Sequence, residues 1–235
     1  MTDRTPLVLL PGLLCDQALW QRQIEGLADL ADPSVADLTQ DASLPAMAAR
    51  VLAAAPPRIA LAGLSMGGYV AQEIMRRAPE RVERLALLDT NARADRPDQT
   101  ARRRDLIALA RRGRFKGVTK RLLPYLIHPD RLDDAPLTGV VMGMAERIGR
   151  EAFLRQEESI MGRLDGLEDL RRIVCPTLIL CGAQDVLTPP KVHREMADRI
   201  PHARFVVIEN CGHLSTLERP EEVTAAMRAW LSEPT

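Results

Sequence analysis

One serine lies in a pentapeptide whose residue types and spacing could support nucleophilic chemistry. The pentapeptide is Gly63-Leu64-Ser65-Met66-Gly67, and it stands between a strand-like run and a helical pattern. A sharp strand-to-helix turn needs glycines where side chains would collide with neighbouring backbone, and it leaves the serine hydroxyl exposed at the end of the strand. The pattern predicts that Ser65 is a nucleophile. The alternative is a glycine-rich turn that only packs a helix closely on a strand.

A serine hydroxyl is a weak nucleophile until a base, most often a histidine, takes its proton. The chain has four histidines. His213 follows the last strand-like run of the chain, and we therefore expect it at the same edge of the sheet as Ser65. The others, His128, His193 and His202, adjoin a proline or lie inside a helical pattern. His213 is the predicted general base, although an isolated histidine is more often a solvated or core residue.

A histidine base needs an acid that fixes its tautomer and stabilises the imidazolium. Asp185 comes shortly after the strand-like run Thr177–Cys181 and is the predicted acid. Asp89, directly after the run Leu85–Leu88, is the alternative. Either carboxylate could instead cap a helix, as aspartates in loops often do.

Short apolar runs alternate with longer helical patterns along most of the chain. Runs this short, bounded by turn residues, are typical of strands in a parallel sheet covered on both faces. The predicted strands are Leu7–Leu10, Ser34–Leu38, Arg58–Ala62, Leu85–Leu88, Thr177–Cys181 and Arg204–Ile208. The main predicted helices are Gln17–Leu30, Leu44–Ala55, Met66–Arg77, Pro190–Ile200 and Pro220–Leu231. The alternation predicts an α/β fold with a doubly wound, mostly parallel sheet of about six strands.

One long segment between the fourth and fifth predicted strands contains no strand pattern. It holds helical stretches rich in Arg, Leu and Met, such as Asp98–Arg112 and Pro136–Ile148. Roughly 75 residues of helix is far more than a crossover connection needs. We predict a helical insertion at about residues 91–164, here called the cap, within a single domain spanning residues 1–235. Because ligands of open α/β sheets bind beyond the carboxyl ends of the strands, we expect the cap to cover that edge.

These features together resemble the α/β-hydrolase superfamily, in its branch of small cofactor-free esterases, lactonases and C–C bond hydrolases. The resemblance covers nearly the whole chain, and the order serine, aspartate, histidine is that of the superfamily. The segments that carry it are Leu7-Val8-Leu9-Leu10-Pro11-Gly12, the Ser65 pentapeptide, Cys175-Pro176-Thr177 leading to Asp185, and Cys211-Gly212-His213.

The resemblance implies hydrolysis of a carboxylic ester or lactone through an acyl-enzyme. Ser65 would attack the carbonyl carbon, His213 would transfer the proton, and Asp185 would orient His213. The backbone N–H groups of Met66 and Leu13 would form the oxyanion hole. No metal and no organic cofactor is implied. The same residues could serve thioester or C–C bond hydrolysis or acyl transfer, and a ligand sensor with little turnover is an alternative of another class.

Composition excludes several other classes of protein. The chain has 235 residues, a hydrophobic fraction of 46% and a formal net charge of zero. Nucleic-acid binding would normally leave a basic excess, and no apolar run approaches the roughly 18 residues of a spanning helix. The N-terminus lacks the pattern of a signal peptide. We therefore expect a cytoplasmic enzyme whose partner is a small molecule, with no nucleic acid and no membrane involved.

The cap has two compositional features that bear on a substrate. Between Ala101 and Arg121 there are nine basic residues and one acidic residue. Such a run is usually a solvated helix face, and the alternative is a mouth that attracts anions. Aromatic residues make up only 3% of the chain, so we expect Leu, Met and Ile to line much of the pocket. The four cysteines have no paired spacing, which favours buried free thiols over a zinc site.

Overall fold

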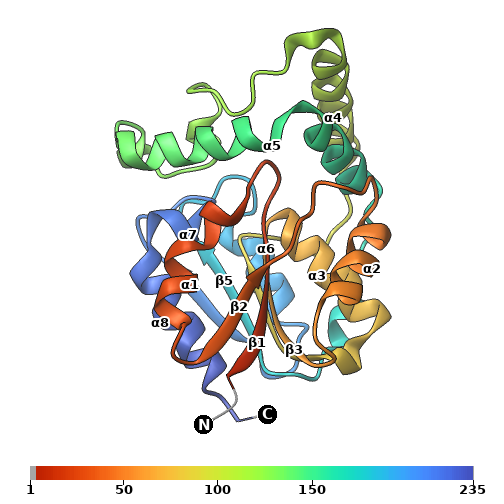
Figure 1. Cartoon of the computed structure of the whole chain (residues 1–235), viewed down its shortest axis with the longest axis vertical. Coiled ribbons are helices and arrows are strands. Elements are labelled where there is room, and N and C mark those ends of the chain that lie inside the picture. The colour runs from red at the N-terminus through yellow and green to blue at the C-terminus, as the bar shows by residue number, and fades with distance from the viewer. Residues whose placement is uncertain (1–3, 235) are drawn as a thin grey trace.

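Six parallel strands form the centre of the computed structural model, which describes residues 4–234 (Figure 1). The strand order is β2-β1-β3-β4-β5-β6, and every neighbouring pair is parallel. The strands are β1 (Thr5–Leu10), β2 (Ala31–Val35), β3 (Ile59–Leu64), β4 (Val82–Leu88), β5 (Thr177–Gly182) and β6 (Arg204–Ile208). The predicted α/β fold and strand number are confirmed, with a sheet that is entirely parallel.

The second strand lies earlier in the chain than the sequence pattern predicts. The prediction was Ser34–Leu38, whereas β2 spans Ala31–Val35 and includes Pro33. Proline has no N–H to donate to a ladder, and it is tolerated here because β2 is an edge strand with β1 as its single neighbour. Leu38 is buried, but it lies beyond the strand, in the loop that follows.

Helices cover both faces of the sheet because alternate strand residues point to opposite sides. Leu7 and Leu9 pack in a core cluster with residues of α1 and α8, whereas Val8 and Leu10 pack with residues of α2, α3 and α6. The helices on the sheet are α1 (Gln21–Leu27), α2 (Leu44–Ala54), α3 (Met66–Arg77), α6 (Pro190–Ala197), α7 (Ser215–Glu218) and α8 (Pro220–Leu231). The predicted helix Gln17–Leu30 is divided into a 3₁₀ turn, Gln17–Trp20, and α1.

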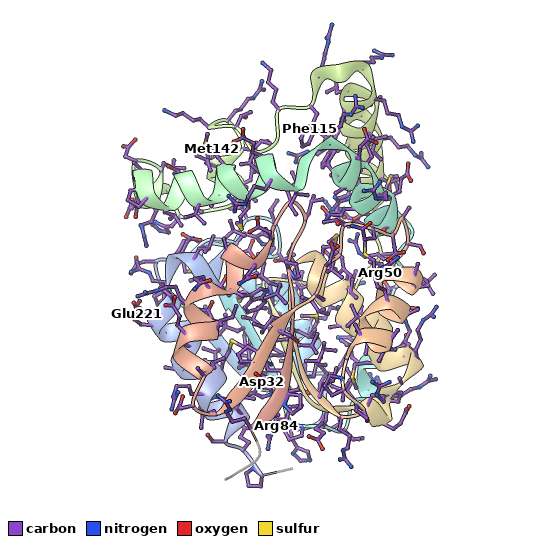
Figure 2. The ribbon with its side chains drawn as sticks, in the orientation of Figure 1. Asp32, Arg50, Arg84, Phe115, Met142 and Glu221 are labelled. Atoms are coloured by element: carbon purple, nitrogen blue, oxygen red, sulfur yellow. The ribbon has the colours of Figure 1, made fainter. Side chains whose placement is uncertain are left out.

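Two further helices, α4 (Pro97–Leu109) and α5 (Ala135–Met161), belong to the segment predicted as the cap, and they lie above the sheet in Figure 1. Gly149 has φ 73° and ψ 178°, so α5 consists of two arms joined by a kink. In Figure 2 Phe115 and Met142 lie in this upper layer, while Asp32 and Arg84 lie toward the chain termini. Within residues 4–234, no helix combines the length and apolar character needed to cross a membrane.

Candidate active site

Ser65 lies in a turn that only glycines at the flanking positions permit. A Cβ atom on Gly63 would lie 2.4 Å from the carbonyl oxygen of Gly67, and one on Gly67 would lie 2.1 Å from that of Leu10. Ser65 itself has φ 53° and ψ −116°, outside the usual range for a residue with a side chain. Its N–H donates to Leu88 O at 3.0 Å, which ties the turn to β4. The turn therefore presents the hydroxyl at the carboxyl end of β3.

The structure places His213 between Ser65 and Asp185. The Nε2 atom of His213 lies 2.9 Å from Ser65 Oγ, and Nδ1 lies 2.8 Å from Asp185 Oδ2. Both His213 and Asp185 are buried. Burial opposes protonation of the imidazole, but the charge and hydrogen bond of Asp185 outweigh it and raise the pKa of His213 above its usual 6.5. The three side chains predicted from widely separated segments therefore form one hydrogen-bonded chain.

Asp185 is held by a short loop that leads into α6. Its Oδ1 accepts from the backbone N–H of Leu187 at 2.8 Å and of Thr188 at 2.9 Å. The hydroxyl of Thr188 donates to Oδ2 at 2.7 Å. Burial favours the neutral acid, yet His213 and these donors together hold the pKa of Asp185 below its ordinary value. Sequence reasoning missed Thr188, which the Asp-x-x-Thr spacing ahead of Pro189 could have indicated.

Asp89, the alternative acid, lies close by but has different partners. Its Oδ1 accepts from Gly182 N–H at 3.1 Å, and its Oδ2 accepts from the N–H of Ser215 at 3.2 Å and from the Ser215 hydroxyl. Burial, reinforced by the charge of Asp185, raises the pKa of Asp89 to about 8. Asp89 therefore joins the end of β5 to the start of α7, and the carboxylate that contacts His213 is that of Asp185.

Two backbone N–H groups predicted for the oxyanion hole belong to segments that adjoin Ser65. Met66 follows the serine directly and is the first residue of α3, where helix N–H groups lack internal acceptors. Leu13 lies in a turn closed by Cys15 N–H donating to Gly12 O at 3.1 Å. A Cβ atom on Gly12 would lie 3.4 Å from Ser65 Cβ, so this turn abuts the serine. Within residues 4–234 neither N–H donates a hydrogen bond.

The histidine loop is packed against a segment of the predicted cap. The N–H of His213 donates to Leu126 O at 3.1 Å. Glu218 bridges the two segments, because one carboxylate oxygen accepts from Gly212 N–H at 2.9 Å and the other accepts from His128 N–H at 2.7 Å. Burial raises the pKa of Glu218 to about 7. These contacts place the segment around Leu126 over the carboxyl edge of the sheet.

A second buried histidine is part of the scaffold. The Nε2 atom of His193 accepts from Thr90 N–H at 2.8 Å, and its Nδ1 lies 3.4 Å from Pro189 O. Burial lowers the pKa of His193 to about 4, so the ring is neutral. Because Thr90 follows β4 and Pro189 precedes α6, this ring joins two loops on the same edge of the sheet as Ser65.

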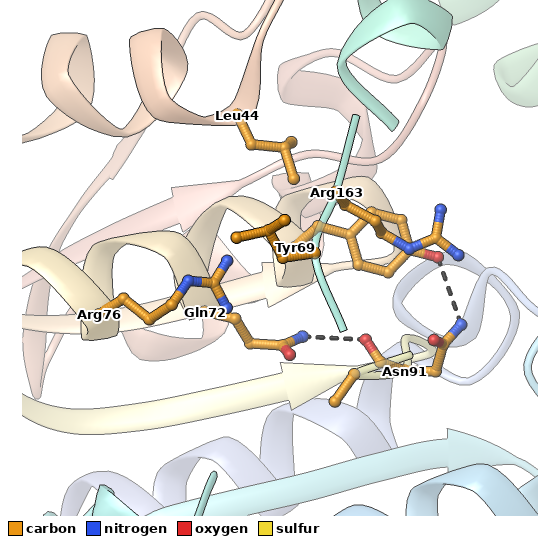
Figure 3. Close-up of a pocket in the computed structure, with 8 residues that line it drawn as sticks. Leu44, Tyr69, Gln72, Arg76, Asn91 and Arg163 are labelled. Atoms are coloured by element: carbon orange, nitrogen blue, oxygen red, sulfur yellow. Dashed lines mark hydrogen bonds between the residues drawn. The ribbon is translucent and has the colours of Figure 1, made fainter. Parts of the chain in front are cut away.

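A small cavity beside α3 lies where the end of the cap meets the sheet layer (Figure 3). The guanidinium carbon of Arg163 lies 4.4 Å from the centre of the Tyr69 ring, and Gln72 Nε2 donates to Asn91 O at 2.9 Å. The cavity volume is about 10 Å³, which accommodates about one water molecule. A groove of about 380 Å³ lies near the C-terminal end of α3, beside Arg76 and Ile173, away from Ser65.

The described chain offers little for a metal ion. Among residues 4–234 there is no group of three or more His, Cys, Asp or Glu residues arranged to hold one. The four cysteines are free, and three of them, Cys15, Cys181 and Cys211, are buried.

Comparison with known proteins identifies the family. The sequence pattern of the alpha/beta hydrolase family matches residues 7–226. The chain belongs to this family. A thermophilic esterase from Thermogutta terrifontis shares 31% sequence identity with this α/β-hydrolase, with a TM-score of 0.88 over 97% of this chain and 89% of that one. The superfamily resemblance and fold predicted from the sequence are thereby confirmed.

Two further comparisons extend over most of this α/β-hydrolase. The pimeloyl-[acyl-carrier protein] methyl ester esterase of Nitrosomonas europaea is 27% identical over 95% of this chain and 94% of its own length. The enol-lactonase from Burkholderia xenovorans LB400 shares the fold with a TM-score of 0.88 at 22% identity, over 98% of this chain and 92% of that one. Family membership and relatives named esterases support hydrolase activity.

Proposed function

We propose that this α/β-hydrolase cleaves a carboxylic ester or lactone of a small, largely apolar substrate through an acyl-enzyme. The observation that carries the proposal is the hydrogen-bonded chain from Ser65 Oγ through His213 to Asp185, with distances of 2.9 and 2.8 Å. A serine next to a histidine that is oriented by a buried carboxylate is the arrangement that activates a hydroxyl for attack on a carbonyl carbon.

In the proposed reaction His213 accepts the hydroxyl proton as Ser65 attacks the carbonyl carbon. The Asp185 carboxylate keeps the Nδ1 proton in place and stabilises the imidazolium, and it stays ionised because its pKa is held low. When the tetrahedral intermediate collapses, His213 returns the proton to the leaving alcohol. Water activated by the same histidine then attacks the acyl-enzyme, which releases the acid and restores Ser65.

Charge that develops on the carbonyl oxygen would be stabilised by the N–H groups of Met66 and Leu13. The N-terminal end of α3 adds a favourable helix dipole at the same place. Leu14, Ala110, Ala145 and Phe153 form a buried apolar cluster between the cap and the turn Gly12–Cys15, and we propose that an apolar acyl group lies beside this cluster. Two similar proteins are named esterases, which favours an ester among the possible acyl substrates.

The test is to screen the purified protein on ester, lactone, thioester and diketone panels and to compare it with Ser65→Ala. We expect Ser65→Ala to fold normally and to lose about a millionfold in kcat, as other triad nucleophile knockouts do. A serine-directed phosphonate should label Ser65 alone by mass spectrometry. Ester turnover that survives in Ser65→Ala would contradict the proposal. Saturable binding without turnover in the wild type would instead favour a ligand sensor.

A further inference from the structure

A buried glutamine of the cap contacts the turn that contains the second oxyanion donor. Gln156 lies in the second arm of α5 and is 1% exposed. Its Oε1 accepts from Leu14 N–H at 3.1 Å, and its Nε2 donates to Leu38 O at 3.2 Å. A backbone N–H can only donate and a carbonyl oxygen can only accept, so these two partners fix which way the carboxamide faces.

The turn that Gln156 contacts has an unusual backbone. Leu14 has φ 58°, the left-handed region that leucine rarely adopts. It is the third residue of the turn Gly12–Cys15, the position at which a type II turn requires a positive φ and normally has glycine. The peptide between Leu13 and Leu14 is held on both sides, because Gln156 accepts its N–H and the Cys15 thiol donates to its carbonyl oxygen at 3.4 Å.

If Leu14 N–H lost its acceptor, we would expect the turn to relax to a backbone conformation that leucine adopts more readily. Rotation of the Leu13–Leu14 peptide would bring Leu14 back to a negative φ, and the adjoining Gly12–Leu13 peptide, which carries Leu13 N–H, would have to adjust to keep the turn closed. This turn abuts Ser65, with the Cβ position of Gly12 only 3.4 Å from Ser65 Cβ. Oxyanion donors act only within a narrow range of distance from the developing charge.

We infer that Gln156 is a positioning residue for the oxyanion donor Leu13 N–H, acting from the cap through the N–H of Leu14. The inference rests on the proposed hydrolase function. It also makes the cap part of the catalytic geometry, since removal of one cap side chain changes how well the transition state is bound. The substrate can be bound as before, because Gln156 is buried between two loops.

The test compares Gln156→Met with a control on the same helix. Methionine matches glutamine in length but accepts no strong hydrogen bond, so Leu14 N–H loses its partner. The control is Arg155→Met, because Arg155 Nε donates to Thr39 O at 2.7 Å. Arg155 thus joins α5 to the loop that contains Leu38, as Gln156 does, but it does not contact Leu14. The readouts are kcat and KM on a nitrophenyl ester, and the dissociation constant of an alkyl boronic acid, which forms a tetrahedral anion on the serine.

We expect Gln156→Met to lower kcat at least tenfold, to leave KM within threefold, and to weaken boronic acid binding by the same factor as kcat. Loss of a whole oxyanion donor costs roughly 10²–10³ in kcat, and a displaced donor costs less. Arg155→Met should stay within threefold of the wild type in all three. An unchanged kcat in Gln156→Met, unchanged boronic acid affinity, or an equal loss in Arg155→Met would overturn the inference.

One further variant keeps the outcome decisive. If Gln156→Met does not fold by circular dichroism, Gln156→Glu takes its place, since burial keeps its carboxyl group neutral, so that the C=O still accepts from Leu14 N–H and the O–H donates to Leu38 O. Boronic acid affinity within threefold of the wild type is then expected, and a tenfold loss would refute the positioning role. Failure of the proposed function looks different: the wild-type protein would neither turn over esters nor bind the boronic acid.

Discussion

Replacing the two buried aspartates one at a time separates the acid of the proposed triad from its neighbour. In Asp185→Asn, the backbone N–H groups of Leu187 and Thr188 both point at the Oδ1 position, so the amide oxygen must occupy it. The NH₂ group then takes the Oδ2 position, 2.8 Å from His213 Nδ1. It donates to Nδ1 and forces the ring proton onto Nε2, which cannot then accept a proton from Ser65.

The expected loss in kcat for Asp185→Asn is about 10⁴-fold, or about 5.4 kcal/mol of transition-state stabilisation. Asp89→Asn should behave differently. Above the pKa of about 8, where Asp89 is ionised, both of its oxygens accept from backbone N–H groups, those of Gly182 and Ser215, so an amide would leave one of them facing another donor. That mismatch should reduce the free energy of unfolding by about 1–3 kcal/mol and leave kcat within about tenfold.

The assay is steady-state hydrolysis of a nitrophenyl ester by both variants, with urea denaturation of each. The two measurements separate a catalytic loss from a loss of stability. The reasoning would be refuted if Asp89→Asn lost a thousandfold in kcat while Asp185→Asn kept more than a tenth of its activity. That result would make Asp89 the acid, the alternative that the sequence left open.

Three further predictions concern the base, the serine turn and the acyl pocket. Because Asp185 raises the pKa of His213 and the neutral imidazole is the base, kcat/KM should rise with pH through a midpoint above 6.5; a flat profile with rate-limiting chemistry would contradict this. In denaturant titrations Gly67→Ala should lower the free energy of unfolding by at least about 3 kcal/mol or fail to fold, because its Cβ would lie 2.1 Å from Leu10 O. Gly139→Ala, whose Cβ would have no atom within 4 Å, should raise the free energy of unfolding by about 0.5–1 kcal/mol. Along a series of nitrophenyl esters, each methylene should add about 0.8 kcal/mol to the free energy of substrate binding until short to medium acyl chains fill the pocket. Rates that climb to long chains would show a deeper site.

Much of the fold and the positions of the candidate residues could be predicted because they depend on local patterns. Short apolar runs between turn residues located the strands, and parallel strands bring their carboxyl ends to one edge. Ser65, Asp185 and His213 each follow a strand, so their proximity could be expected from three separate segments. The strand β2 was misplaced because Pro33 argues against a strand until it is known that β2 lies at the edge.

The remaining features depend on contacts that no local pattern records. Gln156 reaches Leu14 across 142 positions and Leu38 across 118, and nothing in the sequence near Gln156 points to either loop. The kink at Gly149 could not be predicted either, because a glycine inside a helical pattern is often compatible with a straight helix. Asp89 and Asp185 both follow strands, and the choice between them required knowledge of the donors that surround each carboxylate.

The attachment of the cap to the histidine loop has a consequence for how substrate range could be changed by protein engineering. Leu126 O accepts from His213 N–H, and a Cβ atom on Gly212 would lie 2.7 Å from the backbone of Ile127, so this part of the cap is fitted to the loop that carries the base. The exposed stretch from Arg111 to Arg114 has no such fit. Libraries aimed at new substrates should therefore vary that stretch and the exposed residues of α4, but keep Arg103, which donates to Glu157 at 2.6 Å, and the buried Ile107. A transplanted cap has to reproduce the backbone around Leu126 or lose the alignment of the histidine.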